Sequence, residues 1–136
     1  MHIRTLKPLL FSLLLLLSPL AAADEYEEAV AALTNGDYSE ASRSFKRLAK
    51  RDHAEAQYQL GMLYLFGQGV GQDAQKGVSW LKQAALGGSY LAANELSQIY
   101  LSGQWVQRDE TEAVKWLELS SEIAEQNAGE ADDGCE

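Results

Sequence analysis

The sequence predicts an all-α protein, a right-handed α-solenoid of about three antiparallel helix-turn-helix repeats. Three observations support this fold class. The chain of 136 residues matches itself at an offset of 36. Apolar residues recur at helical spacing on both sides of glycine-containing turns. An aspartate stands where the second helix of each unit would begin. Self-similarity at a period of roughly 20 to 50 residues is typical of stacked repeats.

The first residues are expected to be a secretory signal peptide. Arg4 and Lys7 precede an apolar run over residues 9–17, and the alanines at 21–23 suit cleavage after Ala23. A membrane anchor is the alternative, but the run is shorter than the roughly 20 residues that span a bilayer. We therefore expect residues 1–23 to be cleaved, no integral membrane segment afterwards, and a periplasmic or secreted protein of a bacterium.

The composition limits the class of partner. The chain carries 11 Lys and Arg against 20 Asp and Glu, and loss of the signal peptide shifts its net charge from −9 to −11. Nucleic-acid binding depends on Lys and Arg contacts with phosphates, so no nucleic-acid partner is expected, whereas a basic protein partner would fit. The single Cys135 excludes an internal disulfide framework. It is expected to be a tail thiol without structural role, with intermolecular pairing as the alternative.

The first unit, about residues 25–52, is predicted to hold helices over residues 25–34 and 38–51. Asn35 and Gly36 mark the turn between them. Ala41, Phe45 and Leu48 then form an apolar stripe.

The second unit, about residues 53–88, is predicted to hold helices over residues 53–66 and 74–86. Gly67, Gly69 and Gly71 lie between them and raise the question of a phosphate-binding loop. Such a loop follows a strand and has G-x-G-x-x-G or a Lys-Ser/Thr pair, whereas here a helix precedes G-x-G-x-G. We interpret Gly67 and its counterpart Gly103 as helix C-terminal residues with positive φ.

The third unit, about residues 89–126, is predicted to hold helices over residues 90–102 and 110–126. From residue 127 to 136 there is no apolar periodicity, and this acidic tail is expected to be disordered. Matched positions are expected to be structural, with both tryptophans in the core. They are Ala56 with Ala92, Leu60 with Leu96, Tyr64 with Tyr100, Gly67 with Gly103, Asp73 with Asp109 and Trp80 with Trp116.

Four aspartates precede predicted helices and are expected to be N-caps: Asp37, Asp52, Asp73 and Asp109. An Asp accepts hydrogen bonds from the free amides of the first turn. A Glu three residues after Asp109 would complete a capping box by reaching back. These acidic residues are thus explained by helix capping rather than by catalysis.

The second unit, AEAQYQLGMLYLFGQGVGQDAQKGVSWLKQAALGGS, resembles the Sel-one-like repeat (SLR) family of the tetratricopeptide superfamily. It has the family's A-x-x-x-L-G-x-x-Y, including Gly61, then G-x-G-V, Asp, Trp and A-A-x-x-G at fixed spacing. The third unit departs from this pattern with Ser97 for the Gly and Trp105 in the loop. The first unit is more similar to a plain tetratricopeptide repeat. Some exported members staple each repeat with a disulfide, and this chain lacks the cysteines to join that subgroup or to imply its penicillin-binding activity.

No constellation of residues predicts catalysis. His53 is the single histidine after cleavage, and it is expected to be a surface or interhelix residue. Zinc sites need three or four clustered ligands, so neither a metal nor a cofactor is expected. A cell-wall hydrolase or β-lactam-binding enzyme, with His53 as its general base, stays a weaker alternative.

The resemblance implies an interaction module, with the first helix of each unit lining the concave surface. We expect an adaptor or scaffold of the bacterial envelope that binds an unknown partner there, and a homodimer is conceivable. A regulator that inhibits a membrane sensor is the alternative. Leu33, Leu65 and Leu101 are expected to pack between units instead. The predicted partner-binding residues are Tyr26, Tyr58, Met62, Asn94, Gln98 and, in the loop, Trp105.

Overall fold

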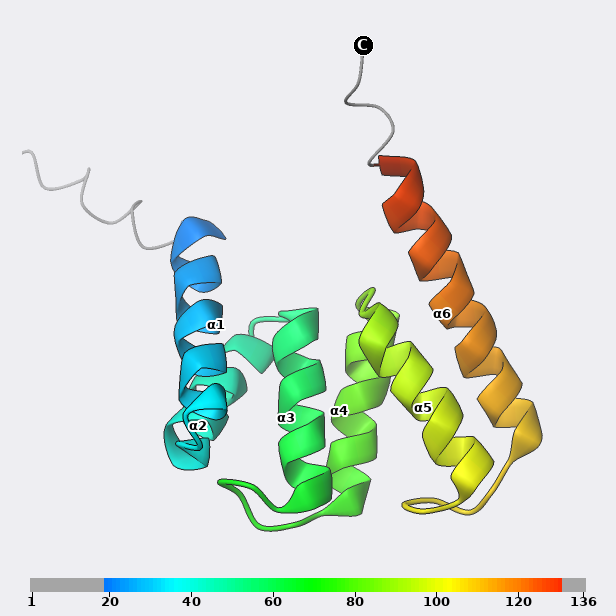
Figure 1. Ribbon diagram of the computed structural model, residues 1–136. Helices are drawn as coiled ribbons and strands as arrows, with labels where there is room; N and C mark the ends of the chain where they lie inside the picture. The colour runs from blue at the N-terminus through cyan, green and yellow to red at the C-terminus, as the bar shows by residue number, and fades with distance from the viewer. Residues whose placement is uncertain (1–18, 131–136) are drawn as a thin grey trace, which may run out of the picture.

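The computed structural model describes residues 19–130, which form six α-helices and no strand (Figure 1). Successive helices pack against one another, so that three antiparallel pairs stand side by side as an all-α repeat solenoid. We call the first helix of each pair (α1, α3, α5) an A helix and the second (α2, α4, α6) a B helix. The bounds are α1 Pro19–Thr34, α2 Tyr38–Ala49, α3 Ala54–Phe66, α4 Ala74–Leu86, α5 Tyr90–Ser102 and α6 Glu110–Glu130.

Aspartates begin all three B helices. Asp37 and Asp73 each accept a hydrogen bond from the backbone N–H three residues later, at 3.2 and 3.0 Å. Asp109 accepts from the N–H groups two and three residues later, both at 3.0 Å. The side chain of Glu112, expected to reach back to this cap, instead accepts a hydrogen bond from Lys115 at 2.8 Å.

The expectation that Asp52 caps an A helix is wrong. His53 is the N-cap of α3, and its Nδ1 accepts from the N–H of Ala56 at 3.2 Å. Asp52 instead takes φ 60°, in the left-handed turn that follows α2. Aspartate tolerates this conformation better than most residues. Asp52 therefore forms part of the turn, and the next residue is the N-cap.

Glycines end the A helices of the second and third units. Gly67 and Gly103 have φ 65° and 69°, and their N–H groups bond to the carbonyls of Leu63 and Ile99. An L-residue pays a steric penalty in this left-handed conformation, so glycine is favoured at both positions. The loops to α4 and α6 therefore leave from the same end of the stack (Figure 1).

Two helix ends differ from the sequence prediction by more than two residues. α1 begins at Pro19 and crosses the expected cleavage position, since the alanines at 21–23 favour helix. α6 runs to Glu130 rather than about residue 126, and the added residues, Asn-Ala-Gly-Glu, have no apolar stripe and include two residues of low helix propensity. The rest of the expected signal peptide (residues 1–18) and of the tail (131–136) lies outside the described residues.

The core consists of two clusters that α3 separates. Ala56, Leu60 and Leu63 pack with α1 and α2, around the fully buried Phe45. Leu65, on the other side of α3, packs with α4 and α5. The first cluster comprises Ala29, Ala41, Phe45, Leu48, Ala49, Ala56, Leu60 and Leu63, and the second Leu65, Val78, Leu81, Ala84, Ala85, Ala92, Ala93, Leu96, Ile99 and Ile123.

The A and B helices of the second unit cross at two glycines. A Cβ on Gly61 would lie 2.9 Å from the carbonyl oxygen of Gly77, and the reverse contact is equally short. In the third unit the buried Ser97 and Ala113 occupy these positions. Trp80 and Trp116 are half-buried rather than fully enclosed, and each packs against one core cluster.

None of the helices between residues 19 and 130 is both long and apolar enough to cross a membrane.

Candidate functional site

Charge is divided between the two kinds of helix. The A helices contain no Lys or Arg. Between residues 19 and 130, every Lys and Arg lies on a B helix or in a loop. The carboxylates of the A helices are Asp24, Glu25, Glu27, Glu28, Glu55 and Glu95. A molecule bound along the A helices would therefore meet carboxylates with no cation on the same helices.

Tyr26 of α1 and Tyr58 of α3 are half-buried side chains of the A helices that lie near each other. The ring of Tyr26 stacks on His53, with centroids 4.9 Å apart and planes 17° apart. Burial raises the pKa of Tyr58 above its usual value of 10.0, and the carboxylates of Glu95 and Glu55 raise it further. Burial also raises the pKa of Tyr26, opposed by the contact with the Gln59 side chain. The three A helices thus bring two tyrosines and two carboxylates together, which we call the tyrosine–carboxylate cluster (Tyr26, Tyr58, Glu55, Glu95).

The other predicted residues of the A helices extend this surface. Met62 is half-buried and packs against the second core cluster. Asn94 is partly exposed and Gln98 exposed. They occupy on α5 the repeat positions of Tyr58 and Met62, so the surface becomes more polar toward the third unit. The sequence also places Glu55 on the predicted concave side, but Glu95 was absent from it, although the lack of Lys and Arg in these segments was a signal.

The prediction that Leu101 packs between units is wrong. Leu65 is 0% exposed, whereas Leu101, at the same repeat position, is 42% exposed. Val78 and Leu81 are 7% and 0% exposed, but their counterparts Val114 and Leu117 reach 51% and 47%. The second unit is covered by the third, while among the described residues no further helix pair follows α6. Leu33, in contrast, is half-buried against the first core cluster.

Lysines of the B helices lie over tyrosine rings of the A helices. The Nζ atoms of Lys46 and Lys76 are each 5.7 Å from the ring centroid of Tyr64. One unit later, Lys82 lies 5.5 Å from the centroid of Tyr100. Lys46 and Lys82 are 36 residues apart, as are the two tyrosines, so this cation–π contact belongs to the repeat.

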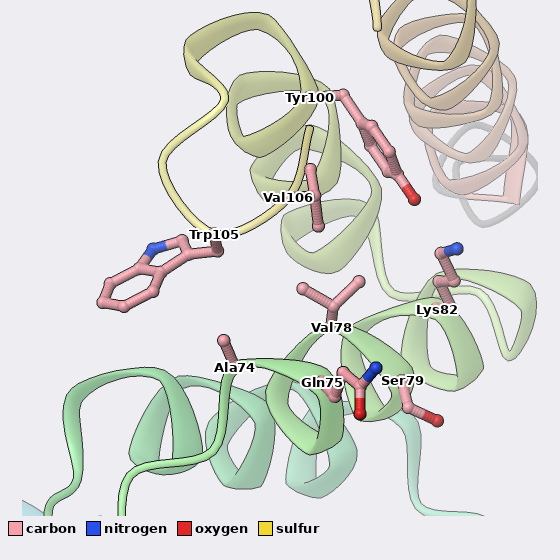
Figure 2. Close-up of a pocket in the computed structure, with 8 residues that line it drawn as sticks. All are labelled: Ala74, Gln75, Val78, Ser79, Lys82, Tyr100, Trp105 and Val106. Carbon is pink, nitrogen blue, oxygen red and sulfur yellow. The ribbon is translucent and has the colours of Figure 1, made fainter. Parts of the chain in front are cut away.

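A pocket of about 320 Å³ lies between α4 and the loop that joins α5 to α6 (Figure 2). Trp105 stands at one end and Tyr100 with Lys82 at the other, while Val78 and Val106 lie between them. Trp105, expected to be an exposed contact, is half-buried and packs edge-on against Phe66 at 5.8 Å. The pocket is lined by Ala74, Gln75, Val78, Ser79, Lys82, Tyr100, Trp105 and Val106. Of these residues, Trp105 alone was predicted to be a partner contact, because it interrupts the repeat, and Tyr100 was expected to be a structural repeat position.

Metal-ligand groups and the single histidine of residues 19–130 bear on the enzyme that the sequence left as an alternative. Within them, no group of three His, Cys, Asp or Glu side chains is placed to hold a metal ion. The imidazole of His53 caps α3 through Nδ1 and stacks on Tyr26. The histidine that an enzyme mechanism would need thus has a structural position.

Known proteins share this architecture and its sequence pattern. The Sel1 repeat model matches residues 54–89 and 91–123. A Sel1 repeat protein from Oxalobacter formigenes superposes with a TM-score of 0.68 at 25% identity, over 82% of this chain and 48% of that one. A protective antigen of uropathogenic Escherichia coli strains, which displays an SLR fold, gives a TM-score of 0.66 at 28% identity, over 74% and 22%.

This chain therefore spans less than half the length of these two structures. The Sel1 repeat fold is that of a protein–protein interaction module, in keeping with the surfaces described above. With half of its residues matched by the family model, the chain belongs to the Sel1 repeat family.

Proposed function

We propose that this protein is an exported, non-catalytic adaptor of the bacterial envelope, which binds a basic segment of a partner protein along its A helices. One observation carries this proposal: helices α1, α3 and α5 contain no Lys or Arg and join two tyrosines with two carboxylates. Tyrosine contributes large contact area at interfaces. A Lys or Arg side chain placed over an aromatic ring beside a carboxylate gains both cation–π and charge interactions.

The B helices support the choice of a basic partner. Lys46, Lys76 and Lys82 already lie over Tyr64 and Tyr100 within the chain. Both of these rings belong to A helices, and their cations come from the neighbouring B helices. Among the described residues, no such lysine lies over the tyrosines of the tyrosine–carboxylate cluster, so a cation from another molecule would make there the contact that B-helix lysines make elsewhere.

Export is proposed from the residue pattern before Asp24. Cleavage after Ala23 would remove the first five residues of α1, including the Ala22 contact with the core. It would keep Tyr26, Ala29 and the ion pairs of Glu25 with Arg47 and Arg51, at 2.9 and 3.0 Å. N-terminal sequencing of protein from the periplasmic fraction should begin at Asp24; recovery of intact chain in the cytoplasm would contradict export.

Site-specific crosslinking in living cells tests the binding surface. A photoreactive residue in place of Tyr58 should capture a defined partner, while the same residue in place of Leu86, exposed on α4, should not. Replacing Met62 and Asn94 by Ala should weaken the capture at position 58. The proposal fails if positions 58 and 86 capture the same proteins, or if the captured segment carries no Lys or Arg.

A further inference from the structure

The loops of the second and third units meet the preceding B helix differently. In the second unit, Gly69 has φ 68°, and a Cβ there would collide with the carbonyl oxygen of Tyr38. The hydroxyl of Ser42 donates a hydrogen bond to the carbonyl oxygen of Gly69 at 3.1 Å. The loop is therefore in direct backbone contact with the first turn of α2.

The third unit replaces each partner in this contact. Trp105 stands at the repeat position of Gly69, Ala74 at that of Tyr38 and Val78 at that of Ser42. Trp105 does not share the left-handed conformation, because Asp52 is the one non-glycine residue with positive φ in the described part of the chain. Val78 has no hydroxyl to bond the loop as Ser42 does, and Trp105 carries an indole where Gly69 has no side chain. The pocket of Figure 2 lies where the second unit has its backbone contact.

The lining of this pocket has a defined chemistry. Ala74, Val78 and Val106 are aliphatic, and Trp105 and Tyr100 add aromatic walls. Lys82 is the one charged side chain in the lining. Its Nζ lies over the ring of Tyr100, and no carboxylate of the described residues forms an ion pair with it. The pocket thus combines aliphatic and aromatic walls, two neutral polar side chains (Gln75 and Ser79) and one cation that has no ion-pair partner among the described residues.

We propose that this pocket is a second binding site, which takes a large apolar side chain adjacent to a carboxylate in an acidic partner peptide. Its volume of about 320 Å³ suits one such side chain and lies at the small end, roughly 300 Å³, of ligand pockets. The apolar group would bury itself between Val78, Val106 and Trp105, and the carboxylate would meet the ammonium of Lys82. The site shares no residue with the tyrosine–carboxylate cluster and does not depend on the proposed function.

The charge of the pocket separates its ligand from that of the A helices. Lys82 would repel the basic segment proposed for the tyrosine–carboxylate cluster, and the carboxylates of that cluster would repel an acidic peptide. The two surfaces are thus expected to select different segments.

Nuclear magnetic resonance titration of the isotope-labelled protein with blocked dipeptides tests the site. The probes are acetyl-Phe-Asp-amide, acetyl-Phe-Lys-amide and acetyl-Gly-Asp-amide. The first should shift the resonances of the Trp105 indole N–H and of the backbone amides of Val78 and Val106. It should bind about fivefold more tightly than acetyl-Phe-Lys-amide, the ratio expected for one partly exposed ion pair of about 1 kcal/mol. It should also bind at least about fivefold more tightly than acetyl-Gly-Asp-amide, which keeps the carboxylate but has no apolar side chain to bury.

A matched pair of variants separates the pocket from general charge effects. Lys82→Glu should reverse the preference, so that Phe-Lys binds better than Phe-Asp. Lys46→Glu makes the same charge change beside Tyr64, the counterpart of Tyr100. Neither Lys46 nor Tyr64 lines the pocket, so this variant should leave the preference unchanged. Circular dichroism melts confirm that both variants fold. The proposal is overturned if no probe shifts the pocket residues, if the three probes bind alike, or if both variants respond alike.

Discussion

Single residues decide how closely the units pack, and Gly69 is the clearest case. We expect Gly69→Ala to lower the free energy of unfolding by about 2 kcal/mol, because it places a Cβ in the left-handed region and breaks the hydrogen bond from Ser42. Gly71→Ala is the control, since a Cβ there meets nothing within 4 Å and its φ is not positive. Its effect should stay within about 0.5 kcal/mol. Urea unfolding measures both; equal losses would contradict the close loop contact.

Tyr58 provides a test of the tyrosine–carboxylate cluster through its pKa. Burial and then Glu95 raise the pKa of this phenol above 10.0, so the folded protein holds the proton longer than the unfolded chain. The associated stability is present below pH 10 and is lost as pH rises through the folded pKa. Glu95→Gln should lower the pKa of Tyr58, seen by ultraviolet titration against a Tyr58→Phe reference. An unchanged titration would mean that α3 and α5 do not bring these groups together.

At the scale of helices, the repeat assigns the same residue to very different environments. Leu81 is fully buried beneath α5, whereas Leu117, 36 residues later on α6, is almost half exposed. Leu81→Ala should therefore cost about 2 to 5 kcal/mol of unfolding free energy. Leu117→Ala should cost well under half as much, because its side chain already meets solvent. Denaturant unfolding of the two variants decides this.

A large loss of unfolding free energy in Leu117→Ala would have one structural explanation. It would indicate that the face of α6 formed by Val114 and Leu117 is covered in solution. Sedimentation of the same sample would then test whether a second copy of the chain covers this face.

The sequence predicted the helices well because their signals are local. The bounds of α4 and α5 agree with expectation, since a capping side chain and a following glycine mark both ends within a few residues. The prediction for Asp52 was wrong because Asp52 and His53 can both cap α3. Asp52 lies in the tight turn, and His53 is the N-cap. Local patterns also overlooked the extension of α6, because residues 127–130 have neither an apolar stripe nor consistently high helix propensity.

The surfaces were harder to predict because they depend on which unit covers which. Leu65 and Leu101 match in sequence, but only Leu65 has a complete unit packed over it. Lys82 was overlooked because a lysine gives no signal until the loop beside it opens into a pocket. Trp105 gave the one usable hint, since it departs from the repeat where its neighbours keep to it.

For the whole molecule, the dominant electrostatic feature is excess negative charge, −9 in the full chain and −11 after the expected cleavage. Such a charge opposes the compact state through self-repulsion. The ion pairs of the described residues act in the opposite direction. All five involve exposed cations, and exposed pairs contribute about 1 kcal/mol at most. We therefore expect repulsion to outweigh pairing.

This balance predicts that salt stabilises the protein. Raising the ionic strength from about 0.01 M to about 0.15 M shortens the Debye length from about 30 Å to about 8 Å. Repulsion between distant carboxylates is then screened, and the melting temperature should rise by about 3 °C, which corresponds to less than 1 kcal/mol in a domain of this size. A variant with Glu27→Lys and Glu28→Lys, both exposed on α1, should melt higher at low salt and respond less to added salt. A melting temperature that falls with salt would show instead that the ion pairs, led by the double contact of Glu25, govern the stability of the stack.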